Sequence, residues 1–307
     1  MKLLLTGATG VIGRRAVPLL VADGHQVTAV GRTAEKRAQL QRAGATPIEL
    51  DLFDQHAAQR AMAGHDAVIN LATHIPPVPR AMMRRRAWRE NDRIRREASA
   101  ALTRAAAAAG VARFIQESFA PMYAAGGDAW LDERSPVAPA PYNRSSLDAE
   151  RHTEGFTALG GTGVVLRFAY FFGPDSTLLP DLLGLLERGW FGMPGRGSAF
   201  LSAVTHDDAA AAVAAALRAP AGTYNVADDE PLRRRDFADA LADAFHRKRP
   251  RLMPAILSHI GGSIMSLLSR SQRISNRKLR DATGWAPAAP SMREGWRRIA
   301  GESSNPM

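Results

Sequence analysis

Cysteine is absent from this chain of 307 residues. The protein therefore cannot form disulfides, use a thiol nucleophile or bind a metal through thiolates. Lysine is scarce as well, with only Lys2, Lys36, Lys248 and Lys278, so nearly all of the positive charge belongs to arginine. The first residues show no charged region followed by an apolar stretch and a cleavage site, so we expect no signal peptide and a cytoplasmic protein.

The charge balance is strongly basic, with a formal net charge of +10 and a pI of about 10.8. Such an excess suits a nucleic-acid-binding protein, but it also suits an arginine-rich composition partly offset by an anionic cofactor or substrate. No helix-turn-helix, zinc-finger or aromatic RNA-binding motif is present. We therefore favour the second interpretation and predict no nucleic-acid partner.

An apolar segment at residues 252–268 is flanked by arginines, which is compatible with attachment to a membrane. The segment is short for a span and contains Pro254, Gly261 and Gly262. We therefore predict a lid or a wall of the substrate pocket, and no membrane partner.

The start of the chain carries its most informative motif, KLLLTGATGVIG at residues 2–13, in which Gly7, Gly10 and Gly13 are spaced three apart. A buried strand that ends in such glycines lets the main chain approach a pyrophosphate closely. The helix that follows presents its free N–H groups to the negative charge. The alternative is a glycine turn that only closes a strand–helix corner.

Short apolar runs alternate with helical patterns along the first half of the chain, which is typical of strand–helix–strand units and a parallel sheet. We predict strands at residues 2–5, 26–30, 46–49, 67–71, 113–116, 164–168 and 223–226, and helices near residues 13–23, 33–43, 54–63, 84–109, 142–158, 207–218 and 234–245. The predicted fold class is α/β, a doubly wound parallel sheet (Rossmann) with a smaller C-terminal substrate lobe.

This scheme predicts two domains. Residues 1–168 form the dinucleotide-binding domain, to which segments from about 200–226 return. Residues 169–307 form mainly the substrate-binding lobe.

Several further segments can be compared with a known family. They are Asp51-Leu52, Asn70 to Thr73, Asn91, Arg167 to Pro174, Val204 to Ala209 and Thr283 to Pro287. In their order and spacing they resemble the extended, and in part atypical, short-chain dehydrogenases/reductases, the NAD-dependent epimerase/dehydratase family. The resemblance implies a nicotinamide dinucleotide cofactor, a small-molecule substrate and, as in many relatives, a homodimer.

The resemblance also implies which residues contact the cofactor: Thr6, Gly7, Gly10, Val11, Ile12, Gly13, Asp51, Leu52, Leu71, Ala72, Thr73, Asn91, Tyr142 and Ser146. The choice between NAD and NADP can be argued from the second strand. NAD-binding proteins commonly place a carboxylate after it to hold the ribose 2′-hydroxyl. Here Arg32 stands in that region, and a guanidinium can bind a 2′-phosphate. We therefore predict NADP rather than NAD; the alternative is that Arg32 only caps a loop in water.

The catalytic motif departs from the family pattern, which is Tyr-x-x-x-Lys with a Ser or Thr after the fifth strand. Tyr142 is present, but Ser146 occupies the Lys position. Counting back four residues from Tyr123 places Phe119 at the Ser/Thr position, with Ser118 one residue away. We take Tyr142 and Ser118 as the catalytic candidates.

Without the lysine ammonium, we expect Tyr142 to titrate near the ordinary tyrosine pKa of about 10, as a poor base but an adequate proton donor. Arg144 and Arg167 are considered as other sources of charge. In the alternative interpretation, Tyr142 only packs against the cofactor.

These arguments predict an NADPH-dependent reductase of a carbonyl or an activated double bond with a non-standard catalytic site. The alternative hypothesis is an NADP-binding protein without redox turnover, acting as a regulator or redox sensor. Because the histidines lack metal-ligand spacing, we predict no metal site.

Overall fold

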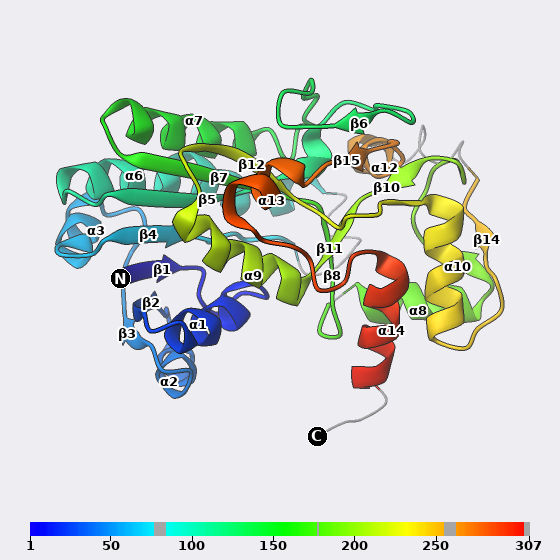
Figure 1. Ribbon diagram of the computed structural model, residues 1–307, viewed down its shortest axis with the longest axis horizontal. Helices are drawn as coiled ribbons and strands as arrows, with labels where there is room; N and C mark the ends of the chain where they lie inside the picture. Colours follow the sequence, from blue (N-terminus) through cyan, green and yellow to red (C-terminus); the bar gives the residue numbers. More distant parts are fainter. Residues whose placement is uncertain (77–83, 177, 255–261, 304–307) are drawn as a thin grey trace.

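The computed structural model describes residues 1–76, 84–176, 178–254 and 262–303, and its centre is a single parallel sheet (Figure 1). Seven strands lie in the order β12-β7-β5-β4-β1-β2-β3. Their bounds are β1 Lys2–Thr6, β2 Gln26–Val30, β3 Thr46–Ile48, β4 Ala67–Asn70, β5 Arg113–Phe119, β7 Thr162–Phe168 and β12 Gly222–Val226. All seven predicted strands are confirmed, and so is the doubly wound α/β class.

The strands are apolar because both faces of the sheet are covered. Leu3, Leu4 and Leu5 of β1 are all fully buried, as expected for an inner strand of a parallel sheet. One layer contains α1 (Gly13–Ala22), α2 (Ala34–Arg42), α9 (His206–Ala215) and α13 (Arg277–Thr283). The other contains α3 (Gln55–Met62), α6 (Ser99–Ala108) and α7 (Ser145–Ala158).

Local capping sets where several of these helices begin. The side chain of Thr33 accepts a hydrogen bond from the N–H of Lys36 at the start of α2, and Asp54 accepts one from Ala57 at the start of α3. Thr205 caps α9 in the same way.

The long helix predicted near residues 84–109 is interrupted. It consists of a 3-10 turn, η1 (Arg85–Trp88), then α5 (Arg89–Arg93), a π-helical turn, η2 (Ile94–Ala98), and finally α6. The π turn carries Arg95, whose side chain is buried and forms two hydrogen bonds to the Glu117 carboxylate at 3.0 and 3.2 Å. A local widening of a helix often marks a functional site.

The C-terminal lobe consists of short two-stranded pairs and helices on the side of the molecule away from the N-terminus, and one of its strands, residues 130–131, comes from the first half of the chain (Figure 1). The pairs are β8 (Tyr170–Phe172) with β11 (Ala203–Thr205), β10 (Phe200–Leu201) with β13 (Leu232–Arg233), β9 (Trp190–Phe191) with β14 (Arg251–Leu252), and β6 (Trp130–Leu131) with β15 (Arg273–Ile274). The helices are α8 (Leu179–Glu187), α10 (Arg234–Ala244), α12 (Gly262–Leu268) and α14 (Met292–Ser303). The short 3-10 turns η3 (Ala120–Met122) and η4 (Ala216–Arg218) complete the described elements.

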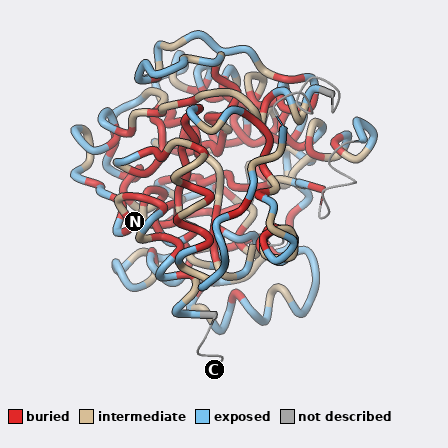
Figure 2. The backbone as a smooth tube through the Cα atoms, turned by 90° about the vertical axis from the view of Figure 1, so that its right-hand side faces the viewer, coloured by how far each residue is buried: buried red, intermediate tan, exposed pale blue. Residues whose placement is uncertain are grey.

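This lobe has an aromatic core of its own. The rings of Phe172, Phe237 and Trp296 pack with centroids 4.9 to 5.5 Å apart. Figure 2 shows the buried residues gathered inside the molecule and the exposed ones along its outer loops and helix faces.

Four helices of the described ranges were not predicted from the sequence: α8, α12, α13 and α14. In α8 the buried residues Leu179, Leu182 and Leu186 recur at helical spacing, a signal masked by the glycines and prolines around it. For the predicted lid at residues 252–268, residues 255–261 lie outside the described part, and α12 is its described end. No helix in the described ranges is long and apolar enough to cross a membrane.

Candidate functional site

The glycine turn between β1 and α1 is packed tightly at two of its three glycines. Gly7 has a φ of +69°, and a Cβ there would lie 2.4 Å from the Leu71 carbonyl carbon. A Cβ on Gly13 would lie 2.3 Å from the Gly7 oxygen. At Gly10, by contrast, the nearest atom to a Cβ is the Gly7 oxygen at 3.2 Å, so this position opens outward. The fold itself requires glycine at residues 7 and 13, whereas residue 10 leaves room for a ligand.

Thr6 connects the end of β1 to the neighbouring strand. Its buried hydroxyl donates to Asn70 Oδ1 at 2.5 Å, and Asn70 Nδ2 donates to Gln116 Oε1 at 2.8 Å. The same Asn70 oxygen accepts from the N–H of Ala72 at 3.3 Å. The structure thus gives Thr6 a positioning contact, because its hydroxyl holds the carboxyl ends of β1, β4 and β5 together.

The loop after β4 lies directly against the glycine turn. Leu71 and Ala72 are buried, Thr73 is half-buried, and the backbone at Leu71 is the part that Gly7 contacts. Asn91, fully buried in α5, accepts a hydrogen bond from the N–H of His74 at 2.9 Å, while its Nδ2 has no hydrogen-bond partner within the described ranges. Gly7 thus contacts Leu71 and Ala72, and Asn91 binds the loop two residues farther on, so the predicted residues 7, 71–73 and 91 lie near one another at the switch point of the sheet.

Arg32 and Asp51 lie farther along the same edge of the sheet, after β2 and β3. Both are exposed, and Leu52 is half-buried. Asp51 accepts the N–H of Phe53 at 3.0 Å, which fixes the turn before α3. Arg37, close to Arg32 in sequence, is held by the Gly31 carbonyl and by Glu49.

Tyr142 lies in a turn just before α7, not inside the helix predicted from residue 142. Its ring packs on Trp88, with centroids 4.7 Å apart, and is only 7% exposed. Burial raises the pKa of Tyr142 far above the ordinary tyrosine value, although the charges of Arg270 and Arg95 partly lower it. The prediction that Tyr142 titrates near its ordinary pKa is therefore wrong, because desolvation outweighs the nearby cations.

The structure does not bring Ser118 to Tyr142. The Ser118 hydroxyl donates to Glu150 Oε1 of α7 at 2.6 Å, and both residues are buried. Its neighbour Phe119 points to the other face of β5, as strand pleating requires, and belongs to the apolar cluster that contains Tyr142. This geometry does not support the catalytic role predicted for Ser118, because Glu150 holds its hydroxyl on the face of β5 opposite Phe119.

Ser146 lies in the first turn of α7, at the position where the family has lysine. It is fully buried, and its hydroxyl has no hydrogen-bond partner within the described ranges. The side-chain amide of Asn143 is in the same state. Buried polar atoms without partners are rare in folded proteins, so this end of α7 has donors and acceptors that a small molecule or water could use.

Neither arginine considered as a substitute for the lysine plays that part. Arg144 is exposed, and the Arg167 guanidinium binds the Glu150 carboxylate at 2.7 and 2.9 Å and the Tyr123 hydroxyl at 2.8 Å. The cations that act on Tyr142 are instead Arg95 and Arg270. Sequence reasoning missed both, because Arg95 reaches the site only through the π turn and Arg270 only through the fold of the second lobe.

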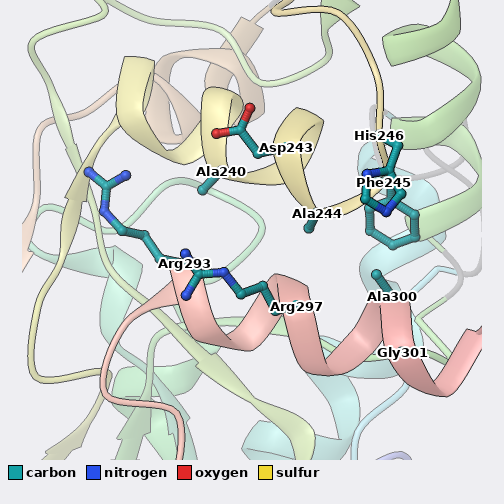
Figure 3. A pocket seen from close by; sticks show the side chains of 9 residues that line it. All are labelled: Ala240, Asp243, Ala244, Phe245, His246, Arg293, Arg297, Ala300 and Gly301. Atoms are coloured by element: carbon teal, nitrogen blue, oxygen red, sulfur yellow. The ribbon is translucent and has the colours of Figure 1, made fainter.

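A hollow lies on the outer surface of the C-terminal lobe. Figure 3 shows it between α10 and α14, with Arg293 and Arg297 beside it and Phe245 and His246 at one end. Its volume is about 540 Å³. None of its lining residues belongs to the glycine turn or to the surroundings of Tyr142, so it is separate from the candidate site. The described residues contain no group of three or more metal-ligating side chains.

Comparisons with known proteins agree with this geometry. Residues 3–227 match the NAD dependent epimerase/dehydratase family. A 3-diazoavenalumate denitrifying reductase from a Streptomyces species is 32% identical to this chain and aligns with 96% of it and 99% of its own length. A 4-hydroxy-2-methyl-3-oxo-4-farnesyl-3,4-dihydroquinoline-1-oxide ketoreductase from Stigmatella aurantiaca is 28% identical over 79% of this chain and 73% of its own. A human epimerase family protein solved with NADPH superposes with a TM-score of 0.76 at 24% identity, covering 98% of this chain and 99% of that one.

Proposed function

Because this chain belongs to the NAD dependent epimerase/dehydratase family, we propose that it is an NADPH-dependent reductase in which Tyr142 donates a proton to a small-molecule acceptor. The family and the reductases among its relatives make it an NAD(P)-dependent oxidoreductase. The named reductase that aligns with almost the whole chain also favours an enzyme over the non-catalytic NADP-binding hypothesis. The choice of NADPH and the role of Tyr142 are our proposal.

The exposed backbone at Gly10, where a Cβ would meet only the Gly7 oxygen, is the observation that carries the cofactor part of the proposal. The residues present fit a dinucleotide: Gly10 and the first N–H groups of α1 suit the diphosphate, and Arg32 suits a 2′-phosphate. Ser146 and Asn91 offer unpartnered polar atoms to its ribose or amide groups. When bound, the reduced nicotinamide supplies a hydride to the acceptor.

The protein's own contribution to the chemistry is a neutral phenol. Since burial raises the pKa of Tyr142, its hydroxyl keeps its proton at neutral pH and can give it to an acceptor oxygen that gains negative charge. The guanidinium groups of Arg95 and Arg270 then offset the charge left on the phenol. The same raised pKa makes Tyr142 a poor base, so the site favours reduction over alcohol oxidation.

A second candidate function follows from what the site lacks. The relative that aligns with almost the whole chain is named for 3-diazoavenalumate, a carboxylate with a diazo group, and for removal of nitrogen. Replacing an aryl diazonium group by hydrogen takes up one hydride, which is two electrons and one proton. The C–N bond breaks, a C–H bond forms and N2 leaves, so no further proton is needed. With Phe119 and Ser146 at two of the three catalytic positions, the site suits such a reaction as well.

The substitution Tyr142→Phe separates the two functions, because it keeps the ring against Trp88 and removes only the hydroxyl. We expect the reduction of benzaldehyde to fall by about 10²- to 10⁴-fold, as for the loss of a general acid. The reduction of benzenediazonium should stay near the wild-type rate. Both rates are measured as enzyme-dependent NADPH oxidation.

Tyr224→Phe is the matched control, since the Tyr224 hydroxyl donates to the Pro220 carbonyl at 2.9 Å, away from the site. Full benzaldehyde reduction by Tyr142→Phe would contradict the role of the phenol. A wild-type protein that binds NADPH but reduces neither acceptor would contradict the proposed function as a whole.

A further inference from the structure

Arg234, the first residue of α10, is a buried cation with unused hydrogen-bond donors. Its side chain is 0% exposed. Nη2 donates to the carbonyl of Leu268 at 2.9 Å and more weakly to that of Arg270 at 3.5 Å. Nε and Nη1 have no hydrogen-bond partner, and no carboxylate of the described ranges forms an ion pair with the group. A buried charge without a counter-charge is costly, and proteins rarely keep one without use.

The hydroxyl of Tyr170, at the start of β8, is in a similar state. It is buried and has no hydrogen-bond partner in the described part of the chain. Burial raises the pKa of Tyr170, the neighbouring Tyr142 phenol raises it further, and the charges of Arg234 and Arg270 lower it in part. Burial also lowers the pKa of Arg234 to about 10, so the guanidinium still carries its charge at neutral pH.

These polar groups border the apolar cluster around Tyr142. Tyr170 packs edge-to-face on Phe119, with centroids 6.0 Å apart, and Leu267 of α12 belongs to the same cluster as Tyr142. The next residue, Leu268, provides the carbonyl that holds Arg234. On the other side the backbone at Gly195 lies close to the guanidinium, since a Cβ there would be 2.8 Å from Nε.

We propose that Arg234 and the hydroxyl of Tyr170 form a subsite for a carboxylate of the substrate, beside the apolar cluster that contains Tyr142. The carboxylate oxygens accept hydrogen bonds from Nε, from Nη1 and from the Tyr170 hydroxyl, and their charge neutralises the guanidinium. The aromatic rings of this cluster pack against the body of the substrate. This inference rests on the proposed function, because it assigns the substrate class to the same site.

Arg234 also has a structural contact, since Nη2 binds the carbonyl of Leu268, the last residue of α12, where a cation is favourable. That contact uses one of the three guanidinium nitrogens. It does not explain why Nε, Nη1 and the hydroxyl of Tyr170 lack hydrogen-bond partners in the described part of the chain. A purely structural role therefore predicts an effect of Arg234 on stability but no selectivity for anions.

The test is a binding experiment that needs no turnover. Benzoate and benzamide have the same shape and differ in charge, so their affinities for the NADP⁺-loaded enzyme are compared by titration calorimetry. We expect the wild type to bind benzoate at least 10-fold more tightly than benzamide. Arg234→Met should abolish this preference, and Tyr170→Phe should reduce it several-fold without lowering the melting temperature, because the hydroxyl that it removes has no partner.

Arg233→Gln is the matched control. It removes a charge from the preceding residue, whose guanidinium binds Asp128 at 3.1 Å on the surface, and should leave the preference unchanged. A wild type that binds neither compound, or both equally, would overturn the inference, as would a preference that survives in folded Tyr170→Phe and Arg234→Met. Failure of the proposed function would appear separately, as loss of NADPH oxidation with every acceptor.

Discussion

Replacing Gly10 with alanine should separate cofactor binding from folding. A Cβ at residue 10 would meet only the Gly7 oxygen, at 3.2 Å, so a small shift accommodates it. The tight contact and the lower entropy of the unfolded chain act in opposite directions, each by about 1 kcal/mol, and the net change in stability should be within about 1 kcal/mol. The methyl group occupies the opening of the turn, so the diphosphate loses its close approach to the backbone. Losing one or two charge-assisted hydrogen bonds corresponds to roughly 10- to 100-fold weaker NADPH binding.

Gly13→Ala provides the opposite case in the same turn. Its Cβ would lie 2.3 Å from the Gly7 oxygen and 2.7 Å from two backbone atoms of Ala8, so the turn itself must open. We expect a loss of about 3 kcal/mol of stability, which corresponds to a fall of roughly 6–12 °C in melting temperature. Gly155→Ala, on the exposed face of α7 with open space around it, is the control and should be neutral or stabilising.

Two measurements separate stability from cofactor binding in each variant. They are the melting temperature without cofactor and the Kd for NADPH, measured by the quenching of tryptophan fluorescence. Wild-type NADPH affinity in Gly10→Ala would refute the assignment of the turn as a diphosphate cradle. A large loss of stability in Gly10→Ala would instead show that residue 10 needs glycine for the fold alone.

Two further predictions concern charge. Arg32→Ala should weaken NADPH binding by about 10-fold and leave NADH binding unchanged, because only NADPH carries the 2′-phosphate. The control is Arg42→Ala, at an exposed position at the end of α2, which should change neither affinity. Equal losses of affinity for both nucleotides in Arg32→Ala would be inconsistent with a phosphate contact. Burial lowers the pKa of His206 to about 4, with Nδ1 donating to Asp175 at 2.8 Å, so the unfolded state binds more protons than the folded state between pH 6.5 and pH 4. The free energy of unfolding should therefore fall as the pH is lowered across this window, by on the order of 2 kcal/mol from this group, and His206→Gln should remove that part of the slope in urea titrations; an unchanged slope would assign the pH dependence to other groups.

The sheet could be predicted from sequence because its signals are local. Each strand is a short apolar run, and Leu3 to Leu5 are buried on both faces whatever the neighbouring strand. The glycine spacing likewise determined where the first turn lies. In α8 the helical spacing of Leu179, Leu182 and Leu186 was present but was obscured by the turn residues on either side.

The catalytic part of the site depends on contacts between distant segments. Trp88 desolvates Tyr142, and nothing near residue 142 in the sequence announces that contact. The pleat of β5 could have excluded Ser118, since residues 118 and 119 of one strand must face opposite sides. No sequence signal singles out Arg234 from the arginines beside it, because only the tertiary fold buries it. The predicted contacts to the cofactor stay predictions.

β12 has a consequence for anyone who wishes to re-engineer this protein. The strand lies beside β7, and α9 packs on α1. Both β12 and α9 follow the first segment of the C-terminal lobe in the chain, which contains β8, α8, β9 and β10. A fragment ending at Phe168 would leave the hydrogen-bonding edge of β7 bare and the outer side of α1 uncovered, an arrangement prone to aggregation. Exchanging the C-terminal lobe for that of a relative therefore requires two splice points, one on each side of residues 203–226, rather than a single fusion after the first half.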